Sequence, residues 1–383
     1  MIKPIQYDAV NWVDGMKISK KHLDAQTNFI LDGLRDVRAT FNQVFSSGLL
    51  PLDAQNQGRD IVEVRTTISG DVECIIKMCK AITPSGCRVE VSDFSFHVRS
   101  LIPHVGDELE NQKHTYYVVI AINLFHGTPY GAMDAEETPP RHPYTRPKYR
   151  IELRPVTAFD VNNGDNGGDF VIIGQVTTQG DLIKMEDQYI PPCTSIISHP
   201  LLLNQYDKAA KTLPLLQKYA VKILQKEQHI KQNTKLVGSV KLLCQALIQD
   251  VGAVYFHFKN VVPHVPPIYF IACFSQLATH LHQVTQILAP TDLEELLNYI
   301  SEWSEIAPHT FLNQLANVAE IKYQHIDCAQ PLSEIQLMIS CLEKVFFKLN
   351  ELDYIGQRKE NIIVNELEVT PIAKTNRGWS VLD

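Results

Sequence analysis

The spacing of apolar residues changes from one part of this 383-residue chain to the next, and the changes limit the folds available to it. Between residues 61 and 190, apolar residues recur at alternate positions in short runs, which is the period of a half-buried β-strand. Beyond residue 200 they recur every three or four positions, which is the period of an amphipathic helix. The sequence therefore predicts an α+β multidomain protein with a strand-rich N-terminal part and a helical C-terminal part.

Seven alternating runs, separated by turn residues, predict the strands. They cover residues 61–66, 72–82, 87–96, 116–124, 149–156, 170–178 and 182–190. No segment long enough to be a crossover helix separates most of them, so we expect antiparallel pairing rather than a parallel sheet. The number and spacing of the strands favour an antiparallel β-sandwich or barrel, and we place a sandwich in residues 1–200.

Pro191, Pro192 and Pro200 mark the change of domain. The apolar stripes that follow predict three long helices, two shorter ones and a last long one, so we assign residues 201–356 to an α-helical bundle. Residues 357–383 form a short C-terminal tail in this division. The stripes favour packing within one chain, and packing against symmetry mates stays open.

One helix is predicted before the strands. It follows Ser19 as N-cap and ends before Gly48 and Pro51. Its apolar residues form one stripe, and we expect the helix to cover a sheet with it. The stripe consists of Leu23, Ile30, Leu34, Val37, Phe41 and Val44.

A proline-rich segment, residues 127–147, separates two of the predicted strands. Its prolines stand among charged and small residues, which predicts a long exposed loop. Loops of this length either contact partners or are solvated excursions, and the sequence leaves both roles open for this one.

Charge and cysteine usage restrict the partners and the compartment. The formal charge of −8 is spread along the chain without a block of Lys and Arg, which argues against nucleic acid. The eight cysteines form no C-x-x-C pair, so we expect reduced, buried thiols in a cytoplasm. The start of the chain lacks the apolar run of a signal peptide, and no run approaches a membrane span, so we expect no membrane insertion.

Enzyme signatures are absent from the sequence: it contains no G-x-S-x-G, Walker loop, H-E-x-x-H or G-x-G-x-x-G. The Gly-rich stretch 162–169 predicts a hairpin connection rather than a calcium or phosphate loop. His280 and His282 lie on different sides of a helix and cannot share a metal. We expect no catalysis, metal or cofactor. An active site assembled in space at the domain junction is the alternative.

The residues that stand out lie near the start, in the order W-x-x-G-M-x-I-S-x-x-H-L. They are Trp12, Gly15, Met16, Ile18, Ser19, His22 and Leu23. Gly15 permits a tight bend before the helix, and Trp12 and Met16 can pack beneath it or contact another protein. Composition alone favours burial.

This string is similar to the N-terminal signature of the TssK family, W-x-x-G-M-x-L-x-P-Q-H-F, with Lys20 and Lys21 where the family usually has Pro and Gln. Three further stretches resemble the family in the same order along the chain. They are Pro191, Pro192 and Cys193 with Ser198, Pro200 and Leu201; Pro267, Tyr269, Leu277 and Leu281; and Tyr323, His325 and Asp327.

The resemblance implies a homotrimeric structural subunit of a type VI secretion baseplate, located in the cytoplasm at the inner membrane. It implies a β-sandwich shoulder, a helical neck, and docking of the shoulder and N-terminal segment on the wedge proteins TssF and TssG. From it we predict that Trp12, Gly15, Met16, Ile18, His22 and Leu23 contact the wedge.

In that family a C-terminal head reaches the membrane-complex proteins TssL and TssM. Only a short tail follows the last predicted helix here, so we expect the head to be missing and the membrane-side partner to differ, as in the Bacteroidetes-type branch. A phage or contractile-tail component with other partners is a further alternative.

Overall fold

The structure of the chain is a computed structural model. It describes residues 3–52, 61–66, 72–97, 113–159, 169–179, 182–227 and 234–359. The Gly-rich stretch predicted as a hairpin, except Asp169, and the tail from residue 360 onward lie outside these residues.

The first sheet has four strands arranged around a long central one. β3 (Val72–Ile82) pairs on one side with β4 (Arg88–His97) and on the other with β2 (Val62–Thr66) and the two-residue β1 (Gly48–Leu49). All these pairs are antiparallel. In β4, Val89 and Val91 are buried while Glu90 is exposed, as the period of two predicts.

The second sheet has the order β6-β5-β7-β8, and its pairs are antiparallel as well. Its strands are β5 (His114–Tyr130), β6 (Tyr144–Pro155), β7 (Phe170–Gln179) and β8 (Leu182–Met185). The last predicted strand, 182–190, is too long, because the chain turns after β8 with Tyr189 N–H donating to the Glu186 carbonyl at 3.0 Å.

The prediction of a long loop over residues 127–147 is wrong at the two ends of that segment. β5 and β6 continue as a hairpin in which residues 127–130 pair with residues 144–147, so the connection covers only 131–143. The part of β5 after Ile122 pairs with β6 alone among the described residues. A two-stranded ribbon has outer edges that tolerate Pro129 and Pro147, which a central strand would not.

The two sheets contribute to one apolar core. Ile76 and Val89 of the first sheet belong to the same buried cluster as Val118, Ile120 and Ile173 of the second. On the other face of the second sheet, Tyr117, Val119 and Ile172 form a smaller cluster that includes Tyr189. The second sheet is therefore apolar on both faces over part of its length.

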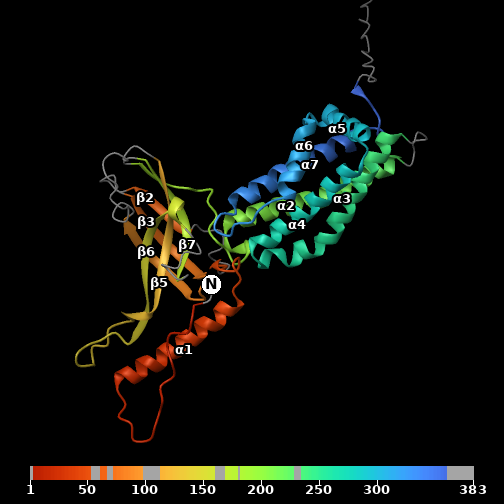
Figure 1. Ribbon diagram of the computed structural model, residues 1–383. Coiled ribbons are helices and arrows are strands. Elements are labelled where there is room, and N and C mark those ends of the chain that lie inside the picture. The colour runs from red at the N-terminus through yellow and green to blue at the C-terminus, as the bar shows by residue number, and fades with distance from the viewer. Residues whose placement is uncertain are drawn as a thin grey trace, which may run out of the picture.

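The C-terminal part is helical, and Figure 1 shows it extending away from the sheets. Its helices are α2 (Pro200–Glu227), α3 (Lys235–Asn260), α4 (Pro267–Ile287), α5 (Pro290–Ser304), α6 (Pro308–Ala319) and α7 (Ala329–Glu351). The predicted count of long and short helices matches these elements. Proline stands at the start of α4, α5 and α6, where its missing N–H has no intrahelical partner to lose.

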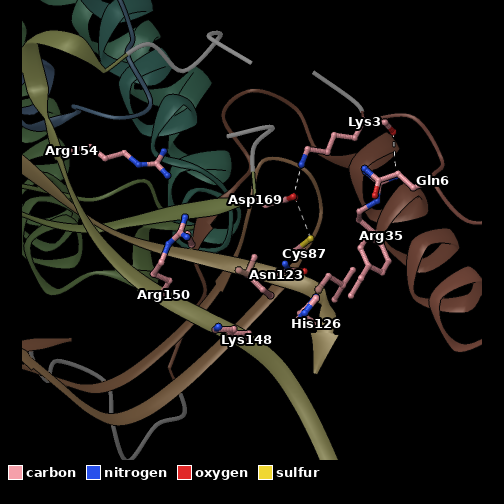
Figure 2. Close-up of a pocket in the computed structure, with 14 residues that line it drawn as sticks. Lys3, Gln6, Arg35, Cys87, Asn123, His126, Lys148, Arg150, Arg154 and Asp169 are labelled. Atoms are coloured by element: carbon pink, nitrogen blue, oxygen red, sulfur yellow. Dashed lines mark hydrogen bonds and ion pairs between the residues drawn. The ribbon is translucent and has the colours of Figure 1, made fainter. Parts of the chain in front are cut away.

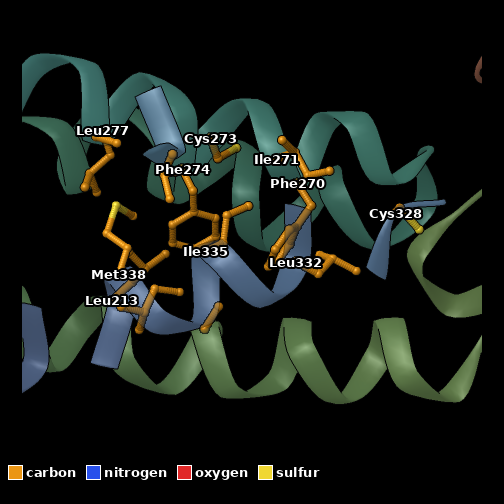
Figure 3. Packing of buried hydrophobic residues seen from close by; sticks show 14 of the residues in the cluster. Leu213, Phe270, Ile271, Cys273, Phe274, Leu277, Cys328, Leu332, Ile335 and Met338 are labelled. Carbon is orange, nitrogen blue, oxygen red and sulfur yellow. The ribbon is translucent and has the colours of Figure 1, made fainter. Parts of the chain in front are cut away.

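The helical core is formed by stripes that face one another. Phe270, Phe274 and Leu277 of α4 lie against Leu332, Ile335 and Met338 of α7, with Leu213 of α2 on the other side (Figure 3). All of these side chains are buried. The predicted apolar stripes after residue 200 therefore pack largely within the chain.

α3 corrects one expectation from the sequence. Within the described ranges it is long and apolar enough to cross a membrane, so the statement that no run approaches a membrane span is too strict. Ten of its residues are buried against neighbouring helices, including Val240, Leu243 and Leu247. That burial accounts for its apolar composition as a core helix.

Several hydrogen bonds join the sheets to the helical part. Leu49 of β1 forms a parallel bridge with Cys193, and its N–H donates to the Pro192 carbonyl at 2.7 Å. Gly48 is needed there, because its φ is +117° and an added Cβ would lie 2.1 Å from the Pro192 oxygen. Tyr189 O–H donates to the Ile326 carbonyl at 2.7 Å.

His325 completes this junction. Its Nε2 lies 2.6 Å from the Ser47 carbonyl and its Nδ1 lies 2.6 Å from the Tyr323 hydroxyl. A carbonyl oxygen only accepts, so Nε2 carries the proton and Nδ1 accepts from Tyr323 O–H. Burial lowers the pKa of His325, which is consistent with a neutral ring.

The lowered pKa of His325 predicts a pH-dependent stability. In the unfolded chain His325 titrates near its ordinary pKa of 6.5, so between that value and the folded-state pKa the unfolded chain binds more protons. The contribution of His325 to the free energy of unfolding is therefore fully present above pH 6.5 and falls as the pH drops below it. Urea unfolding at pH 7.5 and at pH 5.5 should show that the free energy of unfolding falls less between these two pH values in His325→Gln than in the parent chain. An equal loss in both proteins would contradict this assignment.

Candidate docking surface

Helix α1 (Lys20–Phe41) rests on the sheets through its polar side. Its buried residues are Asp32, Arg35 and Ala39, which recur every three or four positions and so share one face. That face lies against the β3–β4 turn, where Gly86 has a φ of +89° and an added Cβ would lie 2.5 Å from the Arg35 carbonyl oxygen. Glycine permits both this close approach and the left-handed conformation.

The apolar stripe of α1 points away from the body. We call Leu23, Ile30, Leu34, Val37 and Phe41 the outward stripe; these five side chains are 49 to 82% exposed. At about 100° per residue they lie on the side of the helix opposite Asp32, Arg35 and Ala39. The predicted helix and Ser19 N-cap are confirmed, but the prediction that the stripe covers a sheet is wrong.

A buried ion pair explains why the polar side faces inward. Asp32 Oδ1 accepts from Arg35 Nε at 2.8 Å, and the two side chains are almost completely buried. Asp32 Oδ2 also accepts from the backbone N–H groups of Gln6 and Tyr7, at 2.5 and 3.1 Å. Arg35 Nη2 donates to the carbonyls of Lys3 and Pro4, at 3.2 and 3.0 Å. The pair thus binds the N-terminal segment to α1.

The N-terminal segment then loops beyond the start of α1 (Figure 1). Gly15 lies in a turn with a φ of +76°, which the bend expected there requires. Trp12 packs edge-on against the His22 ring, with centroids 6.1 Å apart. His22 Nδ1 accepts from Ser19 N–H at 3.2 Å. His22 therefore supports both the start of α1 and the Trp12 side chain.

The six predicted docking residues take different positions on this segment. Trp12, Gly15, Ile18 and Leu23 are exposed, and Met16 and His22 are half-buried. Composition favoured burial of Trp12, and that expectation is wrong, because Trp12 is 47% exposed. Leu23 belongs both to this set and to the outward stripe, so exposed apolar residues continue from the segment along α1.

Sequence reasoning missed Asp32 and Arg35. Their signal was an acidic and a basic residue three positions apart on the polar side of an amphipathic helix, which usually indicates a solvated pair. Burial became apparent only with the fold, because the partners at residues 3–7 lie far away in sequence.

The domain junction contains titratable side chains of the kind that an enzyme uses. Tyr323 and His325 are within hydrogen-bond reach there, but His325 uses both ring nitrogens to hold Tyr323 and the Ser47 carbonyl. Burial raises the pKa of the nearby Cys328 thiol to about 12, which disfavours the nucleophilic thiolate. Within the described ranges, no three His, Cys, Asp or Glu residues lie together so as to hold a metal.

No protein-family model matches this sequence, and no curated protein matches it. The fold does match solved structures. A crystal structure of TssK aligns with a TM-score of 0.51 at 15% identity, over 88% of this chain and 70% of that chain. The chain has the fold of TssK.

A second match is a chain of the baseplate complex from the type VI secretion system. Its TM-score is 0.52 at 11% identity, over 88% of this chain and 99% of that chain. A match over 88% of the chain includes residues of both the sheets and the helices.

Proposed function

We propose that this chain is a structural, non-enzymatic baseplate subunit of a type VI secretion system. The observation that carries the proposal is the TssK fold over 88% of the chain, together with the N-terminal string that resembles the TssK signature. In this proposal residues 1–200 form the β-sandwich shoulder and residues 201–356 form the helical neck. The protein acts in the cytoplasm at the inner membrane.

The proposed subunit is a homotrimer that links the baseplate wedge to the membrane complex. Light scattering on the purified chain tests the trimer. We expect a mass three times the 43.4 kDa of one chain over a wide concentration range. A monodisperse monomer over the same range would count against the trimeric adaptor.

The proposed wedge contact is the N-terminal segment together with the outward stripe, and its occupant is a TssF-like or TssG-like wedge protein. Exposed apolar side chains gather there from Trp12 to Phe41, and contiguous apolar patches of this kind mark interaction surfaces. Asp32 and Arg35 hold the segment and the helix together, so the surface is formed before the partner binds.

Removing residues 1–23 is a poor test of this contact. It would also remove the Gln6 and Tyr7 amides that bind Asp32 and the carbonyls that bind Arg35, so α1 itself would be destabilised. Single substitutions at exposed side chains separate docking from folding.

Trp12→Ala is expected to weaken wedge binding by roughly 30-fold or more. Trp side chains that become buried in an interface are typical hot spots, and each contributes about 2 kcal/mol or more to binding. Ile18→Ser should weaken binding less. Surface-immobilised wedge protein and biolayer interferometry would measure both. Phe256→Ala and Ile287→Ser are matched controls, since both side chains are exposed on the helical part. Equal losses in the test and control variants would rule out this surface.

A further inference from the structure

A cationic cavity lies between the N-terminal segment, α1 and the second sheet (Figure 2). Its volume is about 640 Å³. Among its lining residues are five cationic side chains and one carboxylate: Lys3, Arg35, Lys148, Arg150, Arg154 and Asp169. This excess of positive charge lies on a chain whose net charge is −8. The cavity is separate from the outward stripe, which lies on the other side of α1.

Part of this positive charge is neutralised within the protein. Lys3 forms an ion pair with Asp169. Arg150 and Arg154 share Glu152, with Arg150 Nε 2.5 Å from Oε1 and Arg154 Nη2 2.6 Å from Oε2. The hydrogen bonds from both arginines lower the pKa of Glu152 even though its partial burial opposes this, so Glu152 stays ionised.

Arg35 is paired with Asp32, but its Nη1 is buried without a hydrogen-bond acceptor among the described residues. Lys148 has no hydrogen-bond or ion-pair partner among the described residues. A buried guanidinium nitrogen without an acceptor costs free energy. An anionic group in the cavity would supply that acceptor.

The cations of β6 repeat with the period of an extended chain. Lys148, Arg150 and Arg154 lie on the same face of the strand because they are separated by even numbers of residues. Neighbouring positions on that face are about 6.6 Å apart. Side chains at alternate positions of an extended peptide have the same spacing, so a segment with two Asp or Glu residues two positions apart can match Lys148 and Arg150 in register. Glu152 occupies the next position on that face.

The size of the cavity argues against a single small anion. A single oxyanion would contact only a fraction of a cavity of about 640 Å³. We propose that this cavity binds an extended, carboxylate-rich segment of a partner protein. This assignment goes beyond the baseplate role and does not depend on it.

A fluorescein-labelled octapeptide of alternating Glu and Thr, titrated with the full chain at low salt, tests the assignment by anisotropy. We expect saturable binding to the parent chain and none with the matching Gln-Thr peptide. Lys148→Glu with Arg150→Glu should weaken binding about tenfold or more, since two attractive contacts become repulsive. Both side chains are exposed, so circular dichroism should be unchanged.

The control is Lys211→Glu with Lys241→Glu, which changes the net charge equally at exposed positions on α2 and α3. It should alter affinity less than about twofold. Absence of binding by the parent chain up to 1 mM, or an equal loss in both double variants, would overturn the assignment. Displacement of the peptide by equimolar inorganic phosphate would also overturn it, since that result indicates a simple oxyanion site.

Discussion

Asp32→Ala is expected to release the N-terminal segment from α1. The change removes the acceptor of three hydrogen bonds and leaves Arg35 as a buried charge without its carboxylate. Breaking a buried ion pair by removing one partner costs about 3–5 kcal/mol. Amide hydrogen exchange should therefore show protection of residues 5–41 falling by roughly two to four orders of magnitude, because 1.4 kcal/mol corresponds to a factor of ten.

Asp24→Ala is the matched control. Asp24 lies on the same helix and is exposed, and its replacement should leave the exchange rates of residues 5–41 unchanged within a factor of about two. Unchanged protection in Asp32→Ala would contradict the view that this ion pair holds the surface. Binding to the wedge should fall in Asp32→Ala even though the exposed contact residues remain, because the surface would no longer be formed in advance.

Phe274→Ala is expected to lower the free energy of unfolding by about 3–5 kcal/mol. Phe274 is 1% exposed and packs against Phe258 and Phe270, with ring centroids 5.8 and 5.0 Å away. Truncation of a buried Phe removes its transfer free energy and leaves a cavity that the neighbouring helices fill only in part. Urea unfolding monitored by circular dichroism at 222 nm would measure the loss in the helical part.

Phe256→Ala gives the comparison for this result. Phe256 belongs to α3 and is 75% exposed, so its truncation should change the unfolding free energy by less than about 0.5 kcal/mol. Similar losses for the two variants would mean that the stripe of α4 is not the core of the helical part.

The sequence predicted the bounds of helices and strands better than it predicted which side of each element is buried. The bounds of β3, 72–82, follow directly from a period of two over a long run. The outward stripe of α1 has an equally clear period of 3.6, yet periodicity shows only that one side of a helix is apolar. It does not show whether that side contacts the same chain, and here Asp32 and Arg35 occupy the buried side.

The extension of the β5–β6 hairpin was not predicted for a different reason. Proline is a strong signal against a central strand, and residues 127–147 contain five prolines, among them Pro129 and Pro147. Only the pairing pattern shows that this part of the hairpin is a two-stranded ribbon, where the rule is weaker. Local composition cannot distinguish an edge from a centre.

The candidate sites also show that local sequence reveals only what is close together along the chain. The N-terminal string could be found in the sequence because its residues lie within twelve positions of one another. The cationic cavity could not, because Lys3, Arg35 and Lys148 come from three elements that are separated by many residues and meet only in the fold. The sequence identified the compact motif, and the fold was needed for the dispersed one.

A phage or contractile-tail component outside secretion would use the same fold with different partners, so the identity of the partner separates the two proposals. The most direct test is to co-express this chain with the TssF-like and TssG-like proteins of the same genome and to purify it by an affinity tag. The baseplate account predicts one stable complex that contains all three proteins. Elution of this chain alone, while the two wedge proteins bind each other, would contradict it.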